Sequence, residues 1–234
     1  MKRLSTILAA GMVLLLASCS GGGKEENKTA DTTAAAAPAK PAFQPFKLMM
    51  VTHPVKDFPK WKAAFLAHDS VRKVYGISPL SIGRELADSN NVIVINMISD
   101  IQKTKEFAAL PELKEVMKKG GVVGPPTFDY VEVVRADTSN IPQKDRLMIA
   151  HKVKDYNAWL KVFDGEGTAT RAGFGMIDRG IARGIDDSNM VYVLFAISDM
   201  AKAKARGDSP VLKKIMDSAG VISKPVIHFY KVVE

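Results

Sequence analysis

Apolar and polar positions alternate along residues 46–234 in a pattern that occurs twice. Short apolar runs bounded by polar residues predict four strands in each half of this region. The third run of each half is almost continuously apolar, which indicates a strand buried on both faces. The predicted strands are 48–53, 78–86, 92–98 and 128–134 in the first half, and 147–151, 176–183, 191–197 and 226–233 in the second.

Helix start and stop signals lie between these runs at matching places. Each helical segment follows an aspartate that can accept hydrogen bonds from the first free backbone amides. These aspartates are Asp57, Asp100, Asp155 and Asp199. Glycines 121 and 220 then end the second segment of each half. The order is β-α-β-β-α-β, a ferredoxin-like unit.

The two halves also repeat each other residue by residue. HPVKDFPKWKAAF, residues 53–65, recurs as HKVKDYNAWLKVF, residues 151–163, and further matches follow after a one-residue insertion. We interpret this as a tandem duplication with units at 46–137 and 145–234. Each sheet would carry helices on one face only. Pairing the two remaining apolar faces predicts an α+β fold in which the sheets close into one α/β barrel.

The repeated motif resembles a known family. The pattern V-x-D-[FY]-x-x-W-x-x-x-F, followed by D-S-N in both halves and by S-P-x-L-K-x-x-M-x-x-[AG]-G-V in the second, resembles the dimeric α/β-barrel superfamily. Within it, the chain is similar to antibiotic-biosynthesis-monooxygenase-like and uncharacterised members. The resemblance implies that one chain supplies both halves of the usual pair. It also implies a ligand cavity, either between sheet and helices or inside the barrel.

Residues kept in both halves are the candidates for a pocket. They are His53, Trp61, Phe65, Arg72, His151, Trp159, Phe163 and Arg171. The aromatic residues share a helix face and also suit plain core packing. The arginines suit an anion or an exposed salt bridge at a helix end, with Arg72 continuing the helix face of Trp61. The histidines suit a general base, or a buried ring bonded to backbone. Their pseudo-twofold relation leaves open whether they meet.

Other chemical motifs are missing from the sequence. GGVVGPP, residues 120–126, lacks the Lys-Ser/Thr of a phosphate loop and follows a helix instead of preceding one. No histidine spacing suggests a metal, and the second helical segments hold no histidine of the kind with which haem-degrading relatives bind iron. We therefore expect no cofactor. Gly165 and Gly167 stand in the second half where the first half has Leu66 and Ala67. This divergence suggests that at most one half keeps a working pocket.

The N-terminus predicts a location. Lys2 and Arg3 precede an apolar stretch too short to span a bilayer, and Leu16-Ala17-Ser18-Cys19 resembles a lipobox. This predicts a signal peptide at 1–18, a lipidated Cys19 and a tether at 19–45; the alternative is an ordinary signal peptide that contains a cysteine. Ser20 favours the bacterial outer membrane, on its periplasmic side or at the cell surface.

Charge and cysteine content narrow the classes of function. The net charge is +8, and without the two cations of the signal peptide it is +6. Export and scattered lysines argue against nucleic acid as a partner and favour a solvated surface near anionic lipid. Cys19 is the only cysteine, so its lipidation leaves no free thiol. The sequence leaves the identity of any protein partner open.

Two hypotheses for the function follow. The first is a membrane-anchored lipoprotein that binds a small apolar or aromatic ligand or serves as an accessory protein. The second is a cofactor-independent monooxygenase-like enzyme that acts on a small aromatic substrate; it rests on the resemblance alone.

Overall fold

A computed structural model describes residues 43–234. The expected signal peptide at 1–18, the lipidated Cys19 and the tether as far as residue 42 lie outside the described residues. The first repeat contains β1 (Phe46–Pro54), α1 (Phe58–Ala67), α2 (Asp69–Val74), β2 (Ile77–Glu85), β3 (Asn91–Ile98), α3 (Ile101–Ala108), α4 (Pro111–Lys119) and β4 (Thr127–Ala136). The second contains β5 (Asp145–Lys152), α5 (Tyr156–Glu166), α6 (Thr168–Gly173), β6 (Met176–Gly184), β7 (Met190–Ile197), α7 (Met200–Gly207), α8 (Pro210–Ser218) and β8 (Val226–Val232).

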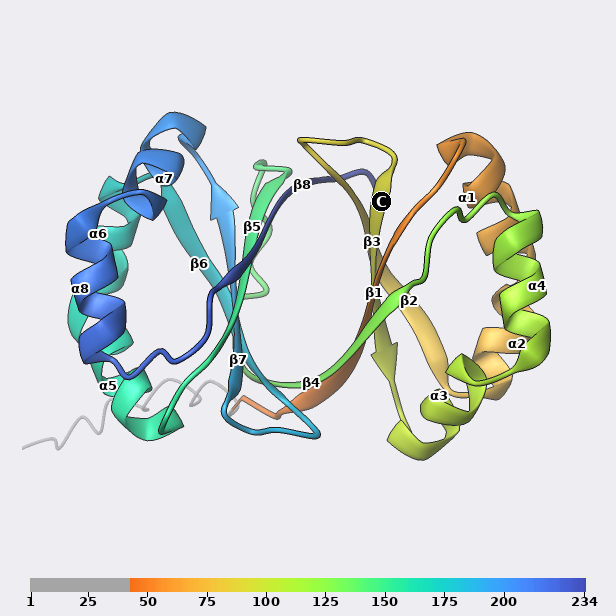
Figure 1. Ribbon diagram of the computed structural model, residues 1–234, viewed down its shortest axis with the longest axis horizontal. Helices are drawn as coiled ribbons and strands as arrows, with labels where there is room; N and C mark the ends of the chain where they lie inside the picture. Colours follow the sequence, from red (N-terminus) through yellow and green to blue (C-terminus); the bar gives the residue numbers. More distant parts are fainter. Residues whose placement is uncertain (1–42) are drawn as a thin grey trace, which may run out of the picture. The chain divides into compact units, whose positions relative to one another are not determined.

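The strands form one closed antiparallel barrel, which confirms the predicted pairing of the two sheets. Their order around the barrel is β1-β3-β2-β8-β5-β7-β6-β4. Two seams join the repeats, one between β4 and β6 and the other between β2 and β8. Closure leaves no strand edge unpaired within the described residues, which removes a site of unwanted pairing. Helices α1–α4 cover one outer side and α5–α8 cover the opposite side (Figure 1).

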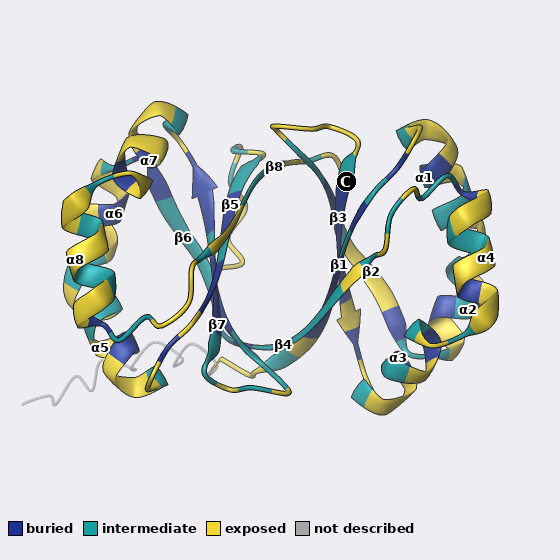
Figure 2. Ribbon diagram, viewed as in Figure 1, coloured by how far each residue is buried: buried dark blue, intermediate teal, exposed yellow. Residues whose placement is uncertain are grey.

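Alternation along the strands divides the apolar residues into three layers. In β1, Leu48 and Met50 point into the barrel, whereas Met49 and Val51 point toward the helices. Val92–Ile95 of β3 are all buried, which confirms the prediction of a strand covered on both faces. Figure 2 shows the resulting pattern, with buried strands between helices whose outer faces are exposed.

The predicted aspartate caps are present. Asp57 accepts a hydrogen bond from the Lys60 amide at 2.7 Å, and Asp155 accepts one from the Ala158 amide at 2.7 Å. Asp100 and Asp199 cap α3 and α7 in the same way. Each aspartate therefore fixes where a helix begins after a strand.

One expectation about the first repeat is wrong. Arg72 does not continue the helix of Trp61, because α1 ends at Ala67 and Arg72 belongs to α2. In an unbroken helix the carbonyl of Phe65 would accept from the amide four residues later. Here the Arg72 Nη1 atom donates to that carbonyl at 2.6 Å. The Phe65 carbonyl also accepts from the His68 amide at 3.2 Å, so a side chain and the C-cap amide together satisfy it at a break that has no glycine or proline.

The turn after α6 gives a testable prediction. Gly175 has a φ of 75°, and a Cβ atom there would lie 2.5 Å from the carbonyl oxygen of Asp199. We expect Gly175→Ala to lower the free energy of unfolding by about 1–3 kcal/mol, because it adds backbone strain and a clash. Urea unfolding followed by circular dichroism measures the change.

Gly173→Ala is the matched control. Gly173 lies two residues earlier, and a Cβ atom there would have nothing within 4 Å. This substitution should change stability by less than about 1 kcal/mol. Equal losses in the two variants would contradict the account of the turn.

Candidate functional site

All eight repeated residues line cavities between a sheet and its helices. His53, Trp61, Phe65 and Arg72 line a cavity of about 70 Å³ in the first repeat. His151, Trp159, Phe163 and Arg171 line a cavity of about 390 Å³ in the second. The two sets occupy equivalent places, but only the second cavity has room for more than a very small molecule.

A column of stacked rings forms one wall of each cavity. The ring centroids of Trp159 and Phe163 lie 5.1 Å apart, and the His151 ring lies 5.7 Å from that of Trp159. The first repeat has the same arrangement, with Trp61 and Phe65 also 5.1 Å apart. These aromatic residues pack in the core and also form a wall of the cavity, because the helix that they attach to the sheet lies beside the cavity.

The two repeated arginines are buried, so the expectation of exposed helix-end salt bridges is wrong. Arg72 is 4% exposed and Arg171 is 2% exposed. Each guanidinium lies over a phenylalanine ring, Arg72 on Phe65 at 3.8 Å and Arg171 on Phe163 at 3.9 Å. Arg171 Nη1 also donates to the Phe163 carbonyl at 2.7 Å. Each arginine thus spans the helix break of its own repeat, because it donates a hydrogen bond to a carbonyl of the preceding helix.

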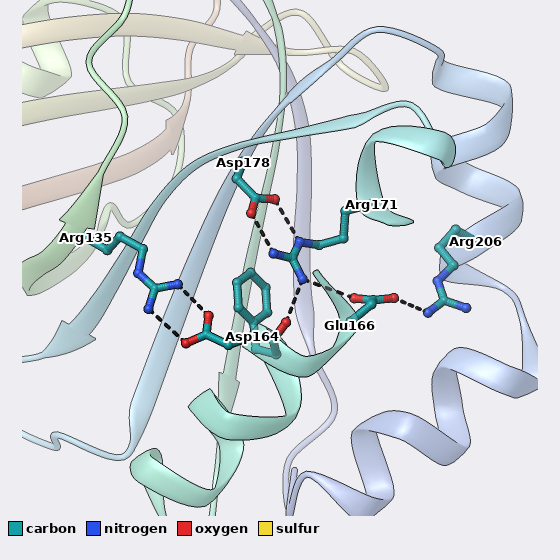
Figure 3. Close-up of polar contacts among 7 residues, drawn as sticks. Arg135, Asp164, Glu166, Arg171, Asp178 and Arg206 are labelled. Carbon is teal, nitrogen blue, oxygen red and sulfur yellow. Dashed lines mark hydrogen bonds and ion pairs between the residues drawn. The ribbon is translucent and has the colours of Figure 1, made fainter. Parts of the chain in front are cut away.

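Arg171 belongs to an ion-pair network that sequence reasoning missed. Its Nε and Nη2 atoms donate to the two carboxylate oxygens of Asp178 at 2.8 and 2.6 Å. Glu166 lies between Arg171 and Arg206 and pairs with both (Figure 3). Because these carboxylates already occupy the Arg171 guanidinium, the cavity wall is close to neutral, and Arg171 is not free for a ligand anion.

Sequence divergence between the repeats accounts for part of the difference between their two cavities. Arg206 stands where the first repeat has Phe107, whose ring packs 5.5 Å from that of Tyr75. The Arg206 guanidinium instead lies 4.6 Å from the centroid of Phe174, the residue equivalent to Tyr75. The aromatic side chain of Phe107 in the first repeat is thus replaced by the ion-paired Arg206 in the second. This replacement was visible in the sequence, but it lies outside the motif that marked the repeat.

The two histidines are buried without hydrogen bonds. His53 is 3% exposed and His151 is 4% exposed, and no described residue bonds to any of their ring nitrogens. Burial lowers the pKa of each from 6.5 to about 4. The expected bond to backbone is therefore absent within residues 43–234. The histidines also do not meet, because each faces the helices of its own repeat.

Residues 43–234 contain neither a cluster of metal-binding side chains nor a membrane-spanning helix. In this range, no three His, Cys, Asp or Glu side chains gather in a group that could hold a metal ion. None of the described helices has both the length and the apolar character that a bilayer-spanning helix needs.

The lowered histidine pKa values predict a pH dependence of stability. An unfolded histidine takes up a proton near pH 6.5, whereas His53 and His151 do so near pH 4. As the pH falls through this window, the unfolded state binds protons that the folded state does not, so the free energy of unfolding decreases. The loss amounts to at most about 3 kcal/mol for each histidine.

Urea unfolding at pH 7.5, 5.5 and 4.5 measures this loss. The double variant His53→Gln/His151→Gln should lose less stability over the window than the unmodified chain. Carboxylates titrate in both proteins, so the difference between their slopes isolates the histidines. Identical slopes would contradict the prediction.

Comparisons with known proteins show the fold. No protein-family model matches the chain, and no curated protein sequence matches it either. An anthrone oxidase-like protein has a similar structure, with a TM-score of 0.57 and 12% identity over 81% of this chain and 92% of that one.

Two further solved structures are similar. For a candidate monooxygenase of Fusobacterium nucleatum the TM-score is 0.51, with 11% identity over 81% of this chain and 93% of that one. For a candidate chlorite dismutase it is 0.50, with 11% identity over 82% and 96%. The chain therefore has the ferredoxin-like, dimeric α/β-barrel fold that its repeated motif resembles, with both halves in one polypeptide.

Proposed function

We propose that this protein binds a small, uncharged, mostly apolar ligand in the cavity of the second repeat, and that a lipid on Cys19 holds it at a membrane. One observation carries the ligand proposal. The cavity of about 390 Å³ contains a buried histidine, His151, whose ring nitrogens have no partner among the described residues.

The size and lining of the cavity suit such a ligand. Pockets for small molecules usually measure about 300–1,000 Å³ and are mostly apolar with a few polar groups. Besides its aromatic wall, this cavity is lined by aliphatic and aromatic side chains from four strands and from α8, among them Leu147, Ile149, Val193, Phe195, Ile215 and Phe229. Burying an apolar ligand there would remove its surface and part of this lining from water.

The electrostatics favour an uncharged ligand. With a pKa of about 4, His151 is neutral at pH 7 and can donate or accept one hydrogen bond. The charged groups Glu166, Arg171 and Arg206 in the wall are paired with one another or with Asp178. The other charged residues of the lining, Lys204 and Asp208, are exposed, so an ion buried beside His151 would lose its hydration without gaining a free buried counter-charge. A hydroxyl or carbonyl facing His151 is the polar group that fits.

The unpartnered histidine also favours an enzyme as the second candidate. A neutral His151 facing an aromatic wall can accept a proton from a bound phenol, as a cofactor-independent monooxygenase-like enzyme acting on a small aromatic substrate would require. A base with a pKa of about 4 is weak at pH 7, since catalytic bases work best with a pKa near the working pH. Binding without turnover is therefore our first choice.

A binding experiment tests the cavity. 1-Naphthol is a neutral aromatic probe with one hydroxyl, and naphthalene lacks that hydroxyl. We expect His151→Leu to weaken 1-naphthol binding about three- to tenfold, because one hydrogen bond is lost, and to leave naphthalene binding unchanged. Ile215→Trp should block both probes by filling the cavity. Fluorescence titration measures the affinities.

Equivalent substitutions in the first repeat are the controls. His53→Leu and Val116→Trp alter the matching positions beside the small cavity and should leave both probes unaffected. Binding that survives Ile215→Trp would place the ligand elsewhere. Dioxygen consumption that depends on 1-naphthol and is lost in His151→Leu would favour the enzyme over the binding protein.

The lipid anchor has its own test. We expect Cys19→Ser to move the protein from the membrane fraction to the soluble fraction and to abolish labelling by radioactive palmitate, because no other cysteine exists. Ser18→Ala, next to the cysteine, is the control and should keep both properties. Palmitate labelling of Cys19→Ser would contradict the assignment.

A further inference from the structure

We propose that the interior of the barrel is a second, separate binding site, and that it takes an amphipathic monocarboxylate such as a medium-chain fatty acid. This site lies on the inner face of the sheets, whereas the cavity with His151 lies on the outer face. The inference therefore does not depend on the proposed function.

The barrel encloses an apolar cavity of about 370 Å³. Both repeats contribute inward-facing side chains to it, among them Leu48, Met50, Val131, Met148, Tyr192 and Tyr230. An apolar cavity of about 150 Å³ can already bind benzene. The barrel therefore has room for a hydrocarbon body considerably larger than one ring.

One end of this cavity is apolar on one side and cationic on the other. By the repeat, Leu48 of β1 corresponds to Arg146 of β5, and Leu80 of β2 corresponds to Arg179 of β6. All four residues line the cavity. Four antiparallel steps around the barrel separate β1 from β5, and likewise β2 from β6, so equivalent strands run in the same direction. Equivalent residues therefore lie at the same end of the barrel, on opposite walls.

Arg146 has unused capacity to bind an anion. Its Nη1 atom donates to the backbone carbonyls of Gln143 and Asp145, at 2.6 and 3.2 Å. None of the carboxylates in residues 43–234 forms an ion pair with it, and the Asp145 side chain pairs with Lys231 instead. Burial lowers the pKa of Arg146, Tyr230 and Asp145 act in the opposite direction, and the nearby charge of Arg179 acts in the same direction as burial.

The charges lining the cavity add to this argument. Arg179 pairs with Asp137 at 3.0 Å, so Arg146 leaves one positive charge in excess among the residues that line the cavity. A guanidinium binds a carboxylate through two parallel hydrogen bonds, and Arg146 still has Nε and Nη2 for this purpose. A fatty acid whose carboxylate binds Arg146 and whose hydrocarbon chain lies inside the barrel matches both the cationic end and the apolar interior of the cavity.

Calorimetric titration of the full chain with decanoate, and with decan-1-ol as the uncharged probe, tests this site. We expect one decanoate per chain. Arg146→Leu should weaken decanoate at least about tenfold, because hydrogen bonds to charged groups are lost, and should leave decan-1-ol unchanged. Leucine already stands at the equivalent position 48, so the substitution suits the fold. Arg179→Leu, which copies Leu80, should act in the same direction and serves if Arg146→Leu fails to fold.

Arg183→Leu is the matched control. Arg183 is also half-buried and donates to a backbone carbonyl, that of Ser188 at 2.7 Å, but it does not line the barrel cavity. Its substitution should leave decanoate binding within about twofold. The proposal would be overturned if decanoate did not bind, or if the Arg146→Leu and Arg179→Leu variants both bound it as tightly as the unmodified chain does.

Ile215→Trp separates this proposal from the proposed function. It fills the cavity on the helix side and should leave decanoate binding intact while it removes 1-naphthol binding. Loss of decanoate in this variant would place the acid beside His151 and overturn the barrel site. Failure of 1-naphthol to bind would count against the proposed function alone.

Discussion

The burial of two apolar sheet faces is the constraint on which the rest of the structure depends. Each four-stranded sheet uses its outer face to hold four helices, so its inner face must be covered by another sheet. The second repeat provides that sheet through the seams β4–β6 and β2–β8. Hydrophobic burial drives this closure, and strand pairing at the seams fixes its geometry. Three cavities result, one inside the barrel and one beneath each helical layer.

The sequence predicted the fold because its signals are local and occur twice. Alternation set the strands, aspartates set the helix starts, and the repeat paired the sheets. The break after Ala67 could not be predicted in this way, because it depends on a side chain that returns to the Phe65 carbonyl. The eight candidate residues line the cavities between the sheets and their helices. The size of each cavity was not predictable, because it depends on packing at positions such as Phe107 and Arg206, outside the shared motif.

The repeats preserve the elements that hold the fold and diverge where they surround empty space. The stacked rings and the arginine over phenylalanine are almost the same in both. In contrast, the Tyr75–Phe107 ring pair is replaced by Phe174 and Arg206, and the cavities differ several-fold in volume. A scaffold made twice can keep one copy well packed while the other copy keeps an opening. The first repeat is thus the more closely packed half, and the second keeps the larger cavity beneath its helices.

Joining both halves in one polypeptide also changes which substitutions are possible. Two identical chains related by a twofold axis must carry each side chain twice, at symmetric positions. An arginine at position 146 would then face a second arginine across the same opening, in place of Leu48. Like charges at one desolvated opening repel, and this would oppose assembly. The single chain escapes this restriction, and its barrel also stays assembled at any dilution, because its halves cannot diffuse apart.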